Sequence, residues 1–346
     1  MTTSVRSFAN GPATSHRLAL ALALALARRG ITTRAIGTTV VTVLVGSVLA
    51  GCGPSFDPAS LIETARVVGA RVEVVGAPDR ASPKPGETAQ VTWLVTAPDT
   101  LPPLAWAYAL CVPGTVDGKV ALGCKGAPLA VFQGTSAPPR ISFTAPAAEA
   151  LGGAASLNVY GQICAGVGST PTFDPDSGIP GCTGDGASTT ASVSIGLELG
   201  TDVNHNPTAD RAFTLDGQPW APLAAASDPC VVGPRMPAGT KDHLIGTTTE
   251  GSDRETFTAQ LGDPPVPTAA RESLQISHFT TAGKLQSQFA FVEAADNAAE
   301  TTVTVKWEAP KASEVPAAGL PVTFTFVVRD DRGGTDWTTR TACVTR

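Results

Sequence analysis

Side chains that carry oxygen recur through one short segment, "GTDVNHNPTAD", at residues 200–210. Calcium binds six to eight oxygen atoms, and alternate side chains of an extended segment can point at one ion. The residues that could bind calcium here are Asp202, Asn204, Asn206 and Asp210. The segment also interrupts the apolar pattern on either side of it, so we expect it to join two domains.

The order of Asp and Asn before Pro207 resembles the calcium-binding linker of cadherins. That resemblance implies a spacer stiffened by calcium. His205 stands where the cadherin pattern has a second acid, so the segment offers few acidic ligands. A linker of Asx turns closed by proline accounts for the same residues without a metal, and we favour it.

Two other groups of acids have the composition of calcium loops. One lies in the glycine-rich loop at residues 166–186, and the other flanks the turn of the last predicted hairpin. Their members are Asp174, Asp176 and Asp185 in the first group, and Asp330, Asp331 and Asp336 in the second. We interpret all six as turn residues that bond to neighbouring backbone groups.

Signals of catalysis are weak. Only His205, His243 and His278 follow the first fifty residues; none has metal-binding spacing, and no G-x-S-x-G motif is present. We therefore expect no enzymatic activity and no cofactor beyond the calcium considered above. The alternative is an envelope hydrolase, or the carbohydrate-binding accessory of one.

The tryptophans distinguish these alternatives. A cleft that places tryptophan rings beside paired carboxylates would favour chemistry on glycans. The residues that could line such a cleft are Trp106, Trp220, Trp307 and Trp337. We expect Trp93 and Trp106 to be buried in a core instead, because both lie in alternating apolar segments.

The chain has seven cysteines, and six of them follow Cys52. An even number of cysteines in an exported chain implies disulfides, and six cysteines allow 15 pairings. We favour two short loops and one long connection, namely Cys111–Cys124, Cys164–Cys182 and Cys230–Cys343. A zinc site is disfavoured because the chain has no C-x-x-C motif.

The N-terminal region has the features of an export signal. Arg28, Arg29 and Arg34 precede an apolar run at residues 36–50, which is shorter than the roughly 20 residues that span a bilayer. The tetrad Leu49-Ala50-Gly51-Cys52 resembles the lipobox of bacterial lipoproteins. It implies cleavage after residue 51 and acylation of the Cys52 thiol, including a palmitate-type chain. An uncleaved anchor helix is the alternative that we disfavour.

Gly53 follows the predicted lipidated cysteine, where Asp would indicate retention at the inner membrane in some bacteria. We therefore expect a lipid-anchored protein of the cell envelope, held at the outer membrane. Without the five arginines of the leader, 19 basic side chains remain against 30 acidic ones, a net charge of −11. So acidic a chain is a poor partner for nucleic acid.

The remaining chain is rich in Thr, Val, Gly and Pro and predicts short strands joined by turns. Seven strands are expected before residue 200, at residues 65–75, 90–96, 103–112, 129–133, 140–144, 156–165 and 189–199. Five more are expected after residue 270, at residues 272–279, 288–292, 301–307, 322–328 and 336–344. Residues 211–270 have no clear pattern.

These strands predict an all-β protein with two tandem Ig-like β-sandwich domains. We place the signal peptide at residues 1–51, a tether at 52–61, the sandwiches at 62–200 and 211–346, and the linker at 201–210. The final hairpin, with Phe324 and Phe326 on one face and a turn at Gly333, resembles the last two strands of Ig-like, PKD-like and cadherin-like domains. The order of all segments resembles uncharacterised lipoproteins of high-GC Gram-negative, myxobacterial-type bacteria.

We expect a binding or structural role without catalysis. The partners would be the membrane, through the lipid anchor, and a protein or glycan ligand. The calcium-stiffened adhesion spacer and the envelope hydrolase remain the alternatives.

Overall fold

The computed structural model describes residues 58–116, 119–173, 180–184, 186–224, 227–261, 264 and 266–346. Cys52 and the predicted leader lie outside the described residues, as do Asp174, Asp176 and Asp185. Residues 58–260 and 267–346 form one compact unit, to which the following description refers. Within the described part of the chain, no helix has the length and apolar character needed to cross a membrane.

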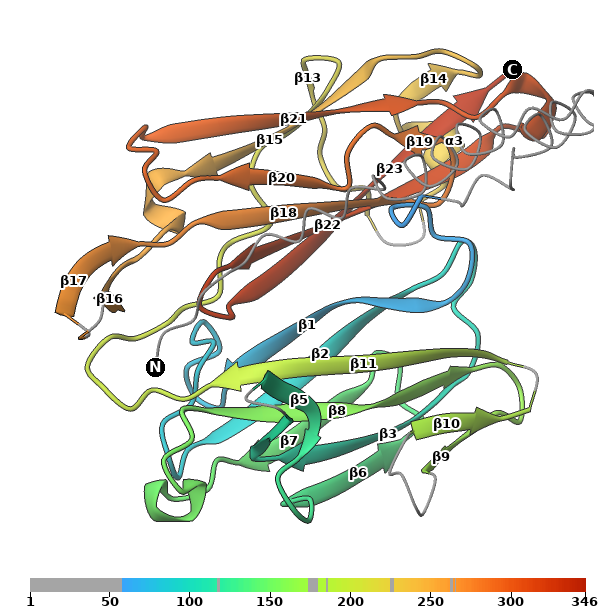
Figure 1. The fold of residues 1–346 in the computed structure, drawn as a ribbon. Helices are drawn as coiled ribbons and strands as arrows, with labels where there is room; N and C mark the ends of the chain where they lie inside the picture. The colour runs from blue at the N-terminus through green and yellow to red at the C-terminus, as the bar shows by residue number, and fades with distance from the viewer. Residues whose placement is uncertain are drawn as a thin grey trace, which may run out of the picture. The chain divides into compact units, whose positions relative to one another are not determined.

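The first sandwich consists of a three-stranded and a four-stranded sheet, coloured blue to yellow-green in Figure 1. The order in the first sheet is β1 (Arg66–Val74), β2 (Thr88–Thr96) and β7 (Arg140–Thr144). The order in the second is β11 (Ala187–Gly196), β8 (Ser156–Ala165), β3 (Leu104–Cys111) and β6 (Ala130–Gly134). All seven strands were expected from the alternation of apolar residues.

The core of this sandwich lies between its two sheets. Trp93 of β2 stacks on Tyr108 of β3, with ring centroids 3.9 Å apart, and both side chains are fully buried. Val91, Leu157 and Val159 belong to the same buried cluster. Alternation along each strand therefore directs every second side chain into one shared core.

Two small hairpins extend the first sandwich and were not predicted. They are formed by β4 (Pro113–Val116) with β5 (Lys119–Cys124), and by β9 (Thr170–Phe173) with β10 (Pro180–Thr183). The disulfides Cys111–Cys124 and Cys164–Cys182 fix them to β3 and β8.

The second sandwich has two five-stranded sheets, coloured yellow to red in Figure 1. One sheet has the order β13 (Gln218–Pro219), β12 (Phe213–Leu215), β15 (His243–Glu250), β21 (Glu300–Glu308) and β19 (Lys284–Leu285). The other has the order β14 (Arg235–Pro237), β23 (Thr335–Thr345), β22 (Leu320–Asp330), β18 (Leu274–Thr280) and β20 (Phe289–Val292). A separate two-stranded sheet contains β16 (Thr256–Leu261) and β17 (Val266–Arg271).

Helical segments are short throughout the described residues. They are α3 (Pro229–Val232) and the 3-10 turns Ala148–Leu151, Gly251–Asp253 and Ala312–Glu314. The disulfide Cys230–Cys343 joins α3 to β23. All three disulfides thus join the pairs that the sequence analysis favoured, and the all-β prediction is confirmed.

The final hairpin forms as predicted, with β22 and β23 paired from Leu320–Val344 to Arg329–Thr335. Asp330 is a turn residue as expected, because its carboxylate accepts the N–H groups of Arg332 and Gly334, each at 2.8 Å. Asp336 is not. Its carboxylate accepts from the Arg71 guanidinium at 2.6 Å and from the N–H of Ala209 at 2.9 Å.

A hydrophobic cluster joins the two sandwiches within the compact unit. Ile62 and Val68, from the start of the described chain, pack with Phe279 of β18 and Val327 of β22. The backbone of residues 60–62 also pairs with Thr280, which receives and donates hydrogen bonds of 2.8 and 2.9 Å. We call this contact region the seam.

Candidate functional site

The tryptophans belong to the protein core. Trp93, Trp106, Trp220 and Trp307 are at most 4% exposed. Three of them donate their indole N–H to backbone carbonyls, at 3.0 to 3.2 Å: Trp106 to Ser136, Trp220 to Thr341 and Trp307 to Ala282. Trp337 is half-buried and packs against the seam cluster. Burial of Trp93 and Trp106 was predicted and is confirmed, whereas Trp307 also lines a groove that contains Asp242 and Glu308.

The predicted calcium ligand Asn206 uses its side chain to connect the sandwiches. Its amide donates to the carbonyl of Val72 in β1 at 2.7 Å, and its oxygen accepts from the N–H of Thr335 in β23 at 2.9 Å. One amide group thus satisfies a backbone group in each sandwich.

The other three predicted ligands point to different partners. Asp210 pairs with Arg340 at 2.8 Å, and Asp202 accepts from the N–H of Thr258 at 2.7 Å. Asn204 is buried, and neither polar atom of its amide has a hydrogen-bond partner within the described part of the chain. The structure therefore does not bring the four side chains together around one point. Among the described residues, no group of three or more His, Cys, Asp or Glu could hold a metal ion.

A partly buried charged cluster lies where the linker meets the second sandwich. Arg332 in the last turn pairs with Glu255 at 3.3 Å and Glu272 at 3.1 Å, and it donates to the carbonyl of Val203 at 2.9 Å. His205 contacts Glu255 through both its backbone N–H and its ring Nδ1. The contacts made by Val203 and His205 tie the linker to the second sandwich.

Two buried acids at this position, Glu272 and Asp330, have raised pKa values. The pKa of Glu272 is raised from an ordinary value of 4.5 to about 7, mainly by burial. The nearby acids Asp330 and Glu255 act in the same direction, whereas the hydrogen bond from the Glu255 N–H and the charge of Arg332 act against it. Burial likewise raises the pKa of Asp330. In the neighbouring core, burial lowers the pKa of His278 to about 4. His278 is therefore a neutral core residue.

A second charged cluster ties the linker to the first sandwich. Arg80 pairs with Glu87 at 2.9 Å and with Glu198 at 2.6 Å. These hydrogen bonds raise the pKa of the Arg80 guanidinium and lower that of the Glu87 carboxyl. The backbone N–H of Asn204 approaches Glu198 at 3.4 Å, and its carbonyl accepts from Ala81 at 2.8 Å. The linker is thus bonded on both sides.

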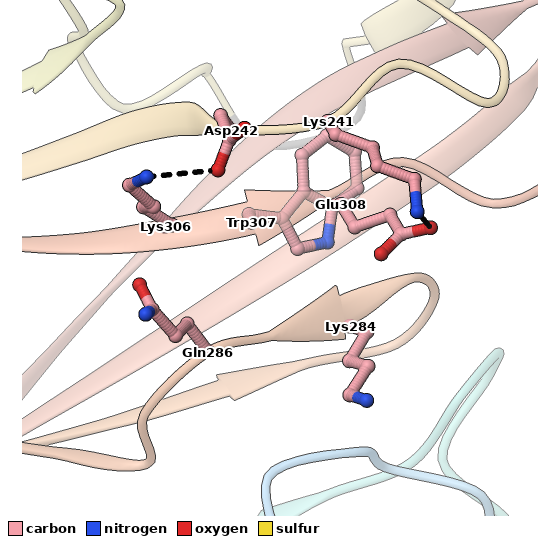
Figure 2. Close-up of a pocket in the computed structure, with 7 residues that line it drawn as sticks. All are labelled: Lys241, Asp242, Lys284, Gln286, Lys306, Trp307 and Glu308. Atoms are coloured by element: carbon pink, nitrogen blue, oxygen red, sulfur yellow. Dashed lines mark ion pairs between the residues drawn. The ribbon is translucent and has the colours of Figure 1, made fainter.

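A groove of about 250 Å³ lies over Trp307, near the ends of β19 and β21 (Figure 2). Three lysines surround it, and two of them are neutralised. Lys241 pairs with Glu308 at 3.2 Å, and Lys306 pairs with Asp242 at 2.9 Å. These side chains are mostly exposed, and such pairs contribute about 0–1 kcal/mol. The groove has charge but little buried structure to orient a ligand.

Two larger cavities are lined by residues of both sandwiches. One, of about 760 Å³, is lined by the end of β11, the linker residues Asp202 and Asn204, and Arg332. Another, of about 400 Å³, lies between β1, β11 and the turn of the last hairpin, and includes Arg329. Sequence reasoning found Asp202 and Asn204 but missed Glu272, Arg329 and Arg332. Nothing in an alternating strand marks which charged residue will face a second sandwich.

Comparisons with known proteins do not assign a family. No protein-family model matches the chain, and no curated protein matches it. One solved structure with some likeness is the two tandem V-type regions of VCBP3, a v-region-containing chitin binding protein. It has a TM-score of 0.23 and 8% identity, over 80% of this chain and 99% of that one.

Another is a structure of a 1.5-MDa bacterial ice-binding adhesin, with a TM-score of 0.19 and 12% identity, over 82% of this chain and 65% of that one. At these TM-scores, neither comparison supports an inference about function.

Proposed function

We propose that this chain is a non-catalytic binding protein of the bacterial cell envelope, anchored at the outer membrane by a lipid on Cys52. Three disulfides support a location outside the cytoplasm, since such bonds persist in oxidising compartments. The lipobox-like tetrad at residues 49–52 supports the anchor. Two acyl chains or more would hold the protein stably on a membrane.

The main support for a binding role is the region where the two sandwiches meet. The linker and the cluster of Ile62, Val68, Phe279 and Val327 join both sandwiches, and two cavities remain between them. Ligand sites occur preferentially at interfaces between domains, because surfaces from two folds converge there. A protein or glycan ligand that contacts both sandwiches fits this arrangement.

The anchor is tested by growing cells with an alkyne-labelled palmitate analogue. We expect label on the wild-type protein and its recovery in the outer-membrane fraction. Cys52→Ala should lose the label and remain with its leader attached, whereas Cys164→Ala should keep the label. Unlabelled wild-type protein would refute the anchor.

The binding role is tested by crosslinking on intact cells, followed by identification of the captured neighbours. We expect one defined partner or one glycan fraction with the wild-type protein. A variant that loosens the seam, Phe279→Ala, should lose that capture if the ligand needs both sandwiches. Capture that is diffuse, or unchanged in the variant, would contradict a binding site at the seam.

A further inference from the structure

One cavity between the sandwiches contains an arginine that has no acidic partner among the described residues. The cavity has a volume of about 400 Å³ and lies between β1, β11 and the β22–β23 hairpin. Apolar side chains of β1 and β11, including Val67 and Val193, form part of its wall. Arg329 of β22 supplies the charge.

The guanidinium of Arg329 reaches from the second sandwich to the first. It donates to the carbonyl of Val68 at 2.5 Å and to the Ser277 hydroxyl at 2.9 Å. These two bonds use two of the five N–H groups that an arginine offers. N–H groups therefore remain for a further acceptor.

In the described part of the chain, no carboxylate lies within ion-pair distance of Arg329. The neighbouring seam arginines differ, since Arg71 pairs with Asp336 at 2.6 Å and Arg332 with Glu272 at 3.1 Å. Burial lowers the pKa of the Arg329 guanidinium, and no acid acts in the opposite direction. A desolvated cation without a counter-charge costs free energy, and an anion bound in the cavity would recover it.

We propose that this cavity binds a small carboxylate with a short apolar tail. The planar guanidinium of Arg329 can bind a carboxylate in a bidentate arrangement, and the apolar wall of the cavity favours a ligand with a tail over inorganic phosphate. The tail packs between Val67 and Val193. This inference rests on the proposed binding role and names its ligand class, but it does not depend on the lipid anchor.

The test is calorimetric titration of the full purified chain with hexanoate, with hexan-1-ol and with inorganic phosphate. We expect saturable binding of hexanoate. Hexan-1-ol should bind at least about tenfold more weakly, because it lacks the charge-assisted hydrogen bonds. Equal affinity for the alcohol, tighter binding of phosphate, or no binding of hexanoate would each overturn the proposal.

A matched pair of variants assigns the site. Arg329→Met keeps the length of the side chain and should weaken hexanoate at least about tenfold. Arg235→Met is the control, because that residue is exposed and, among the described residues, its guanidinium bonds to the carbonyl of Cys230 alone. Unchanged affinity in Arg329→Met would place the ligand elsewhere and refute the site.

Should Arg329→Met not fold, the comparison of hexanoate with hexan-1-ol on the wild type still decides the charge requirement. Failure of this inference is also separable from failure of the binding role. A wild-type protein that captures a defined partner on cells but does not bind hexanoate retains its role and loses this ligand.

Discussion

Individual polar residues connect the two sandwiches and the linker through hydrogen bonds. Asn206 satisfies a carbonyl in β1 and an N–H in β23, and Arg332 connects Glu255, Glu272 and the linker carbonyl of Val203. The residue types that suggested a cation site from sequence serve this purpose because Asn and Asp bond readily to backbone groups.

Asn206→Asp separates the two interpretations of the linker. A carboxylate is the better calcium ligand, but it cannot donate to the carbonyl of Val72. We expect the variant to lose about 1–3 kcal/mol of unfolding free energy. The amide N–H that donates to the carbonyl of Val72 becomes a carboxylate oxygen, and that carbonyl repels it. Neither calcium nor a chelator should shift the melting temperature of the wild type or the variant. A calcium-dependent rise, larger in Asn206→Asp, would instead support the calcium-stiffened spacer.

Glu272 makes stability depend on pH. Its pKa is raised by burial to about 7, so the folded state binds a proton that the unfolded state releases near pH 4.5. Protonation therefore stabilises the fold fully below pH 4.5, and this contribution is lost as the pH rises towards 7. Relative to Glu272→Gln, which has no charge to bury, the wild type should lose up to about 3 kcal/mol across that range.

Denaturant unfolding of both proteins at several pH values measures this difference. The comparison cancels the opposite contribution of His278, whose pKa burial lowers to about 4 and which therefore destabilises the fold as the pH falls. A constant difference between wild type and Glu272→Gln from pH 4.5 to 7 would contradict the assignment.

At the scale of elements, the strands that sequence reasoning predicted are those with one apolar face and one polar face. All twelve expected strands form, because alternation alone specifies which side meets a core. The strand β15 was missed because Gly246 and three consecutive threonines conceal its apolar positions. The short strands β12, β13, β14 and β19 were missed because their few residues are positioned by neighbours and not by their own pattern.

The candidate site could be predicted only in part, for a related reason. The linker stood out because its composition differs from that of the strands. Arg329 and Glu272 did not, since each occupies a strand or strand end where a charged residue ordinarily faces solvent. Only the contact with a second sandwich buries them, and that contact is not encoded in local spacing.

Gly161 is required at the centre of β8. A Cβ at this position would meet Tyr108 of β3 at 2.7 Å and collide with the carbonyl oxygen of Ala107. Gly161→Ala should cost about 1–3 kcal/mol or more, because backbone must move to admit the methyl group. Gly200→Ala is the control, since nothing lies within 4 Å of its Cβ position. Thermal unfolding compares the two, and equal melting temperatures would contradict the predicted clash.

The disulfide between α3 and β23 should be the most stabilising of the three. Cys230 and Cys343 are 113 residues apart, against 18 for Cys164 and Cys182. In the chain-entropy model, removal of the long connection costs about 5 kcal/mol and removal of the short one about 3 kcal/mol. Unfolding of the two double-alanine variants in denaturant measures both. A larger loss for Cys164→Ala/Cys182→Ala would contradict this order.

For the whole molecule, the seam determines whether the sandwiches unfold together. Phe279 is 6% exposed and packs with residues that both sandwiches contribute. We expect one cooperative transition for the wild type in calorimetry. Phe279→Ala should cost about 3–5 kcal/mol and separate the transition into two. Phe291→Ala is the control, because that side chain is 55% exposed at the edge strand β20. Two transitions in the wild type would contradict coupling through the seam.

The pairing of residues 60–62 with Thr280 has a mechanical consequence for an anchored protein. Tension from a lipid on Cys52 would enter the molecule where the first described residues bond to β18, beside both sandwiches. The load would then divide between the two sandwiches and would not pass through them in series. Pulling in that direction should detach this short bridge first, at low force, while both disulfide-stapled bodies stay intact.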